Sequence, residues 1–165
     1  MRYEIYIRRN RKPEGFYIDA ICEYEKRLGP FCRVSWKTVR KEKEWDRLIA
    51  RLQDEMPSGP SGNDTGAKVM ICRILPGPSD MSSLDLAGKM DGWEKQGRKK
   101  VVFLVDDRDD REESRDLPAD VKEGHPVGRE LSVSCFDMDP AMTGMILMEQ
   151  IYRGYRILNN QPYHK

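Results

Sequence analysis

The final stretch of the chain, residues 131–165, reads LSVSCFDMDPAMTGMILMEQIYRGYRILNNQPYHK and combines a strand-like start with a long helical pattern. Asp139 and Pro140 occupy the positions expected for a helix N-cap and first helical residue, and Asn159–Asn160 with Pro162 ends the pattern. The stretch therefore predicts a helix packed on a core or a partner, followed by an extended tail. The expected packing face consists of methionines and tyrosines at steps of three and four: Met138, Met142, Met145, Met148, Tyr152 and Tyr155.

The rest of the chain alternates between strand and helix periodicity. Period-two or continuous apolar patterns predict strands at 2–8, 32–39, 68–75 and 101–105, and helical spacing predicts helices at 14–28, 41–56 and 84–93. Ser82 or Ser83 is the expected cap of the last of these helices. This alternation predicts an α/β fold, an open, mostly parallel sheet with flanking helices, in one domain spanning residues 1–165. Because ligands bind beyond the carboxyl ends of such strands, we expect loops 75–78, 106–110 and 131–137 to gather there.

Composition narrows the function classes. Charged residues make up 35% of the chain, yet the net charge is only +1, so any RNA binding must come from a local patch. The basic turn 8–13 is either a solvated loop or a phosphate-facing patch. No apolar run approaches the roughly 20 residues of a membrane span, so we expect no membrane partner. The expected compartment is the cytoplasm, or an organellar matrix in a eukaryote.

The cysteine pattern argues against metal and disulfide chemistry. Four cysteines are widely spaced, with no Cys-x-x-Cys and no histidine cluster: Cys22, Cys32, Cys72 and Cys135. We expect buried free thiols and no metal site.

Two segments resemble one known family. Residues 149–156 (EQIYRGYR) followed by 162–165 (PYHK) resemble the C-terminal signature of the RlmH family, and residues 16–28 (FYIDAICEYEKRL) resemble its first helix. RlmH proteins are small SPOUT-class methyltransferases that modify a pseudouridine of large-subunit ribosomal RNA. The resemblance implies a C-terminal trefoil knot and a homodimer in which the partner's tail completes each S-adenosyl-L-methionine pocket.

The resemblance also implies roles for individual residues. Ile74 would contact the adenine side of the cofactor, and the 131–136 segment would wrap it with backbone groups: Leu131, Ser132, Val133, Ser134, Cys135 and Phe136. The RNA side would be lined by Tyr152, Arg153, Arg156, Tyr163 and His164. His164, as the C-terminal imidazole, is the candidate base for the pseudouridine N3 proton.

Three positions depart from the family pattern. Asp106 and Asp107 stand where the family has a Gly-Gly pair opening its cofactor loop, and they would bring carboxylates to the cofactor pocket. Asp139–Pro140 replaces a Pro-His with a short insertion, and Gly144 stands where the family has an arginine. Two hypotheses stay open, an rRNA methyltransferase and a catalytically degenerate, ribosome-bound assembly or structural factor. A third reading is an α/β interaction module unrelated to the family.

Overall fold

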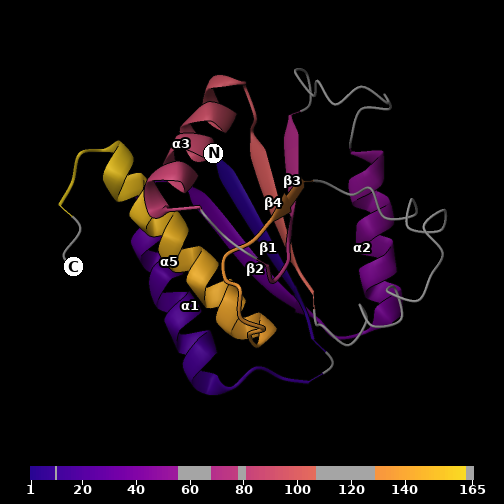
Figure 1. Ribbon diagram of the computed structural model, residues 1–165. Helices are drawn as coiled ribbons and strands as arrows, with labels where there is room; N and C mark the ends of the chain where they lie inside the picture. Colours follow the sequence, from indigo (N-terminus) through magenta and orange to yellow (C-terminus); the bar gives the residue numbers. More distant parts are fainter. Residues whose placement is uncertain (10, 56–67, 78–80, 107–128, 163–165) are drawn as a thin grey trace.

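A parallel β-sheet forms the centre of the molecule (Figure 1). A computed structural model describes residues 1–9, 11–55, 68–77, 81–106 and 129–162. Within them the sheet has the order β2-β1-β4-β3-β5, and all four strand pairs are parallel. The strands are β1 (Arg2–Arg8), β2 (Arg33–Val39), β3 (Val69–Ile74), β4 (Lys100–Val105) and β5 (Arg129–Leu131).

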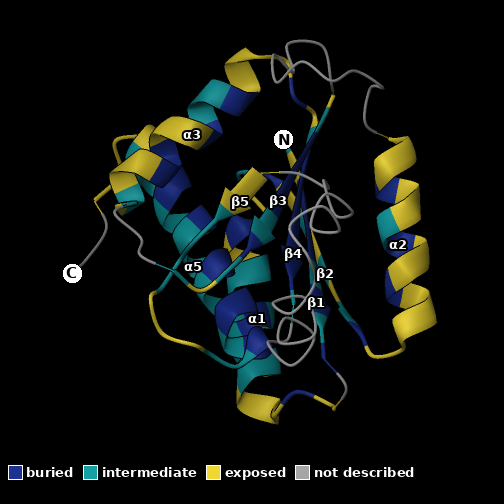
Figure 2. Ribbon diagram, turned by 45° about the vertical axis from the view of Figure 1, so that its right-hand side comes forward, coloured by how far each residue is buried: buried dark blue, intermediate teal, exposed yellow. Residues whose placement is uncertain are grey.

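Helices cover both faces of this sheet, as Figures 1 and 2 show. Three helices pack on one face, namely α1 (Gly15–Leu28), α3 (Ser83–Lys95) and α5 (Pro140–Leu158), and α2 (Glu42–Asp54) packs on the other. The central strand β4 is buried on both faces, which explains its unbroken apolar run. The predicted α/β architecture is confirmed. The path of residues 107–128, on which a trefoil knot depends, lies outside the described residues, so the knot stays a prediction.

Helix α5 runs antiparallel to β1 on the face that it covers. Near the helix C-terminus, the hydroxyl oxygen of Tyr155 lies 3.5 Å from that of Tyr3. Gly144 lies against Ile7, and the helix N-cap Asp139 pairs with Arg9, which follows the strand. Because alternate strand residues share a face, odd-numbered side chains of β1 meet successive turns of one helix.

The predicted packing face of α5 is partly wrong. Met148 and Tyr155 are buried, but Met138, Met142, Met145 and Tyr152 are half-buried. Small residues form much of the true contact face, and their low hydrophobicity hides them from a search for apolar periodicity. The buried residues of α5 are Pro140, Ala141, Thr143, Gly144, Leu147, Met148, Ile151, Gly154 and Tyr155.

Strand β5 ends at Leu131, where the predicted strand-like start of the 131–165 stretch only begins. The chain beyond Leu131 leaves the ladder but stays beside residues 75–77, where two backbone hydrogen bonds hold it. Among the described residues, no helix is long and apolar enough to cross a membrane.

Candidate cofactor site

A small cavity lies at the carboxyl edge of the sheet, beside the ends of β3 and β4. Its free volume is about 20 Å³. The walls combine apolar side chains with two hydroxyls and two carboxylates: Ile74, Leu75, Pro76, Val105, Asp106, Val133, Ser134, Phe136, Asp137, Met138 and Thr143. The described parts of the three loops expected at this edge, residues 75–77, 106 and 131–137, do meet there.

The structure separates the expected cofactor residues into two groups. Ile74, Asp106, Val133, Ser134 and Phe136 line the cavity. The other three described residues of the predicted wrap, Leu131, Ser132 and Cys135, lie outside the lining, and Asp107 lies outside the described residues.

Leu131 and Ser132 instead hold the wrapping segment in place. The amide of Leu75 donates to the Leu131 carbonyl at 2.9 Å, and the amide of Gly77 donates to the Ser134 carbonyl at 3.1 Å. The Ser132 hydroxyl donates to the Gly77 carbonyl at 2.6 Å. Residues 131–134 are therefore pinned to the chain that leaves β3.

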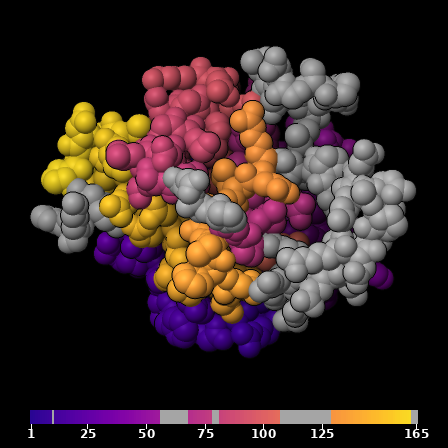
Figure 3. Space-filling view, viewed as in Figure 1, coloured from indigo at the N-terminus to yellow at the C-terminus, as the bar shows by residue number. Residues whose placement is uncertain are grey.

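Past this anchor, residues 135–137 are exposed, and the Phe136 side chain reaches the mouth of the cavity with 74% of its surface exposed. Figure 3 shows the segment that starts at Arg129, in orange, on the surface between α3 and α1. The cysteine expectation is confirmed for Cys32 and Cys72, which are buried, but wrong for Cys135, which is exposed, while Cys22 is half-buried.

Asp106 reaches the cavity from the end of β4 and pairs with Arg8 at the end of the adjacent β1. The Arg8 Nη1 atom lies 3.5 Å from Asp106 Oδ1, a separation of an ion pair rather than a close hydrogen bond. Arg8 also lies over the Trp45 ring on α2, 5.8 Å from its centroid. The Asp106 carboxylate, which stands where the family pattern has glycine, is thus partly neutralised by Arg8 of the neighbouring strand.

The expected RNA-binding arginines lie far along α5 from this cavity. Arg156 donates to the Tyr152 hydroxyl at 3.1 Å and to the Pro162 carbonyl at 2.6 Å, so it ties the start of the tail to the helix. Arg153 lines a groove between α3 and α5. Tyr163 and His164 lie outside the described residues.

That groove is larger than the cavity, about 640 Å³, and it opens beside exposed Leu84. Val133 belongs to both, so the groove and the cavity are neighbours. Apolar side chains form most of its wall, with serines, Gln150 and Arg153 as polar members: Met81, Ser82, Ser83, Leu84, Leu86, Val133, Ile146, Gln150, Arg153 and Ile157.

Sequence reasoning missed six residues that line the cavity: Leu75, Pro76, Val105, Asp137, Met138 and Thr143. Pro76 and Asp137 fall in loops expected at this edge, which was an available signal. Thr143 had no such signal. It lies in the first turn of α5, and only the packing of α5 on β1 brings that turn to the cavity.

A cavity at the carboxyl edge of an all-parallel sheet is where an α/β fold binds its ligand, and the comparisons with known proteins define the class. A family model described as "Predicted SPOUT methyltransferase" matches residues 1–164. The chain therefore belongs to the SPOUT methyltransferase family.

The names of similar proteins point to one branch of this family. "Ribosomal RNA large subunit methyltransferase H 1" of Thermoanaerobacter sp. (strain X514) is 30% identical to this chain, with both chains covered completely. "Ribosomal RNA large subunit methyltransferase H" of Syntrophomonas wolfei is also 30% identical over both full lengths. The Paraburkholderia phytofirmans protein of that name is 28% identical over 87% of this chain and 86% of its own. The RlmH branch is thus the right one, and the reading as an unrelated interaction module is wrong.

Proposed function

We propose that this methyltransferase uses S-adenosyl-L-methionine to methylate a pseudouridine of large-subunit ribosomal RNA. The observation that carries the proposal is the cavity at the carboxyl edge, where three separate loops meet in a chain that matches the family over residues 1–164. The printed names of the relatives supply the RNA class.

The residues at the cavity fit such a donor chemically. Ile74, Val105 and Val133 offer apolar walls for an adenine ring, and the hydroxyls of Ser134 and Thr143 can bond a ribose. The Asp106 carboxylate suits a cationic ligand. When bound, S-adenosylmethionine supplies an activated methyl group on a sulfonium, so the protein contributes mainly by positioning it.

The cavity must widen to hold the donor. Its volume of about 20 Å³ is far below the roughly 300–1,000 Å³ of small-molecule pockets. We expect residues 135–137 to move, because residues 131–134 are pinned to 75–77 and Asp139 is fixed at the start of α5. Phe136 would then close over the bound donor.

The direction of α5 supports a homodimer. This helix begins at the cavity and, with 19 residues, extends about 28 Å away from it. The tail of one chain therefore starts far from that chain's own cavity, at the other end of α5 (Figure 1). A tail that presents Tyr163 and the proposed base His164 to a donor site would do so in a second copy. We propose the groove beside Leu84 as part of that dimer contact.

One observation favours the alternative, a degenerate ribosome-bound factor. The Asp106 carboxylate reaches into a narrow cavity where the family has glycine, which reduces room for the donor. The Arg8 ion pair weakens this argument, because it limits the charge that a donor carboxylate would meet.

Calorimetric titration with S-adenosylmethionine and S-adenosylhomocysteine separates the two. A dissociation constant in the micromolar range rejects the degenerate factor, while no heat and no thermal shift reject the enzyme. Phe136→Ala is expected to weaken binding. Phe16→Ala is the matched control, because Phe16 is also exposed (64%) and does not line the cavity.

Methyl transfer is then tested on ribosomes that lack the modification, with mass spectrometry of the rRNA nucleosides. We expect one methylpseudouridine, and His164→Ala should lower its rate of formation without changing donor affinity. Methylation of another nucleotide would contradict the proposed substrate.

Ribosome co-sedimentation across salt tests the arginines. Arg153→Ala together with Arg156→Ala should weaken association and reduce the slope of log K against log [salt] by about 1–2, one phosphate contact per arginine. Arg27→Ala is the control, because Arg27 pairs with Glu23 on α1. An unchanged slope in the double variant would remove this patch from the RNA interface.

Light scattering after size exclusion tests the dimer. Leu84→Asp should give monomers, since Leu84 is 68% exposed and its charge would be buried in the contact, while Phe16→Asp should remain dimeric. A stable wild-type monomer would contradict the proposed assembly.

A further inference from the structure

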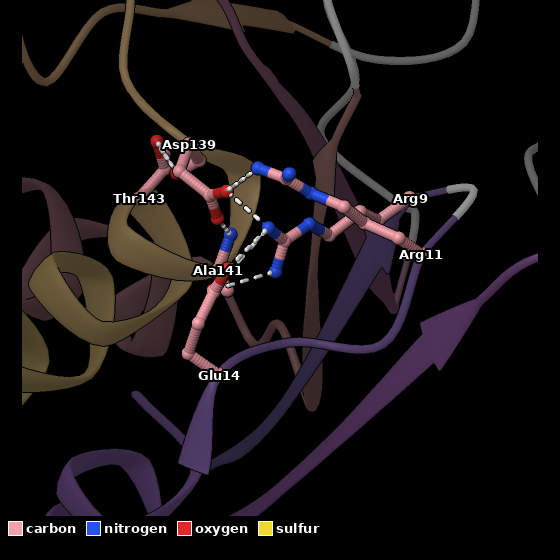
Figure 4. Close-up of polar contacts among 6 residues, drawn as sticks. All are labelled: Arg9, Arg11, Glu14, Asp139, Ala141 and Thr143. Carbon is pink, nitrogen blue, oxygen red and sulfur yellow. Dashed lines mark hydrogen bonds and ion pairs between the residues drawn. The ribbon is translucent and has the colours of Figure 1, made fainter. Parts of the chain in front are cut away.

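A buried guanidinium joins the ends of two helices beside the cavity. Arg9 follows β1, and its side chain is 1% exposed. Figure 4 shows it between the N-cap residues of α1 and α5. Arg9 Nη2 lies 2.5 Å from Asp139 Oδ2, and Arg9 Nη1 lies 3.3 Å from Glu14 Oε2.

Both partners of this ion pair are held rigidly. The Arg9 amide donates to the Val39 carbonyl at 3.1 Å, so the arginine backbone is fixed to β2. Asp139 uses Oδ1 to accept the Ala141 amide at 2.8 Å, which caps α5, and leaves Oδ2 for Arg9. A buried charge is strongly unfavourable without a partner. The burial of Arg9 therefore favours the arrangement in which Asp139 stays beside it.

Asp139 in turn fixes one wall of the cavity. Met138 precedes it and lines the cavity. Thr143, another lining residue, donates from its amide to the Asp139 carbonyl at 3.0 Å and from its hydroxyl at 3.3 Å. The position of Asp139 against the sheet therefore sets where both residues stand.

The spacing of the contacts fits one rigid docking. Arg9 meets Asp139, and Ile7 meets Gly144. The two β1 residues are two positions apart, about 6.6 Å along the strand, and their α5 partners are five positions apart, about 7.5 Å along the helix. The two spacings are similar, so one position of the helix on the strand satisfies both contacts. The exposed segment 135–137 therefore lies between two anchored parts of the chain. Residues 131–134 are bonded to the 75–77 backbone before it, and Asp139 is paired with Arg9 after it.

We propose that Arg9 is a positioning residue for the donor site, which anchors Asp139 so that Met138 and Thr143 form the wall against which residues 135–137 close. This rests on the proposed function for the identity of the ligand. Arg9 is not among the residues that line the cavity, so its role is positioning and not catalytic.

The same carboxylate offers a matched control. Arg11 Nη2 lies 3.6 Å from Asp139 Oδ2, but its side chain is 70% exposed, so solvent screens the pair and its loss should matter little. Arg9→Met removes the buried charge and keeps most of the volume, Arg9→Lys keeps the charge, and Arg11→Met removes the exposed partner.

S-adenosylhomocysteine binding is measured for the wild type and these variants by calorimetry, well below each melting temperature. We expect Arg9→Met to weaken binding at least tenfold, Arg9→Lys to recover part of the affinity, and Arg11→Met to change it less than threefold. A purely structural role would lower the melting temperature and leave affinity unchanged, and that result overturns the proposal. If Arg9→Met does not fold, Asp139→Asn replaces it, because asparagine keeps a cap oxygen and loses the charge.

Hydrogen exchange in ligand-free protein gives a readout that does not depend on donor binding. In Arg9→Met, or in Asp139→Asn, the amides of Ala141 and Thr143 should exchange faster, while those of Leu75 and Gly77 should not change. Wild-type protein that binds no S-adenosylhomocysteine refutes the proposed function, and the exchange pattern then still decides the role of Arg9. Equal exchange in wild type and variant overturns the positioning role.

Discussion

Gly144 of α5 lies so close to Ile7 of β1 that a Cβ on Gly144 would come within 2.5 Å of the Ile7 Cδ1 atom. This contact explains one departure from the family pattern. An arginine at residue 144 would displace the buried side chain of Ile7, because even its Cβ would overlap the Ile7 Cδ1 atom.

Gly144→Ala should therefore destabilise the protein by about 1–3 kcal/mol through overpacking, which lowers the melting temperature in a thermal scan. Gly88→Ala on α3 is the control, because no atom outside the local helix backbone lies within 4 Å of its added Cβ. That change should stabilise the helix by up to about 1 kcal/mol. Equal melting temperatures for the two variants would contradict the close approach of α5.

Ser82→Ala should cost about 1 kcal/mol, the usual value of a lost N-cap. Ser82 accepts the Asp85 amide at 3.2 Å, and Asp85 accepts the Ser82 amide at 2.8 Å, so both bonds of a capping box are present. Urea unfolding at neutral pH measures the loss. Ser35→Ala, at an exposed strand position, should change stability little.

The same cap predicts a pH dependence. Hydrogen bonds from the Ser82 hydroxyl and backbone lower the pKa of Asp85 below its ordinary value of 3.8. A lowered folded-state pKa stabilises the fold above the unfolded pKa, and this stabilisation is lost as pH falls through the folded value. The difference between wild type and Ser82→Ala should therefore shrink below about pH 3.8. A constant difference down to pH 2.5 would contradict this assignment.

The cysteines should differ in reactivity toward iodoacetamide at pH 8. Burial raises the pKa of Cys32 to about 11 and that of Cys72 to about 12, and only a thiolate reacts. Cys135 is exposed and should be modified first, as peptide mass spectrometry would show. S-adenosylhomocysteine should slow its reaction, because the neighbouring residues Ser134 and Phe136 line the cavity. Urea-unfolded protein, modified at every cysteine, is the control, and early labelling of Cys72 would contradict the structure.

Leu52→Ala should destabilise the protein by about 2–5 kcal/mol. Leu52 is fully buried where α2 meets Ile71, Val102 and Leu104 of the sheet. Ile49→Ala should cost less, because Ile49 is only partly buried on the same helix. The urea midpoints of the two variants compare them directly, and similar midpoints would show that α2 is packed differently.

Local patterns in the sequence identified most elements and their ends. The apolar runs of β3 and β4 and the spacing of Trp45, Leu48 and Leu52 on α2 follow directly from strand and helix periodicity. The caps Ser82 and Asp139 were also readable, because each bonds an amide within three residues of itself. The prediction of which α5 residues face the core was partly wrong, because small residues make much of that contact.

The basic turn shows what local patterns could not decide. The run of basic residues predicts a solvated loop or a phosphate-facing patch for Arg8 and Arg9. In the structure Arg9 is buried, Arg8 is half-buried, and each makes an ion pair with an aspartate. Alternation along β1 sends Arg8 to the α2 face and Arg9 to the α5 face, but their partners come from distant parts of the chain.

The sequence by itself determined the alternating α/β elements, their caps and the family, because these depend on neighbours a few residues apart and on short motifs. Only the tertiary structure decided the strand order β2-β1-β4-β3-β5, the face that α5 buries, and the meeting of Arg9 with Asp139 and of Arg8 with Asp106. Those outcomes depend on contacts between residues far apart in the chain. No periodicity records such contacts, because the docking of helix on sheet selects them through packing and the cost of burying an unpaired charge.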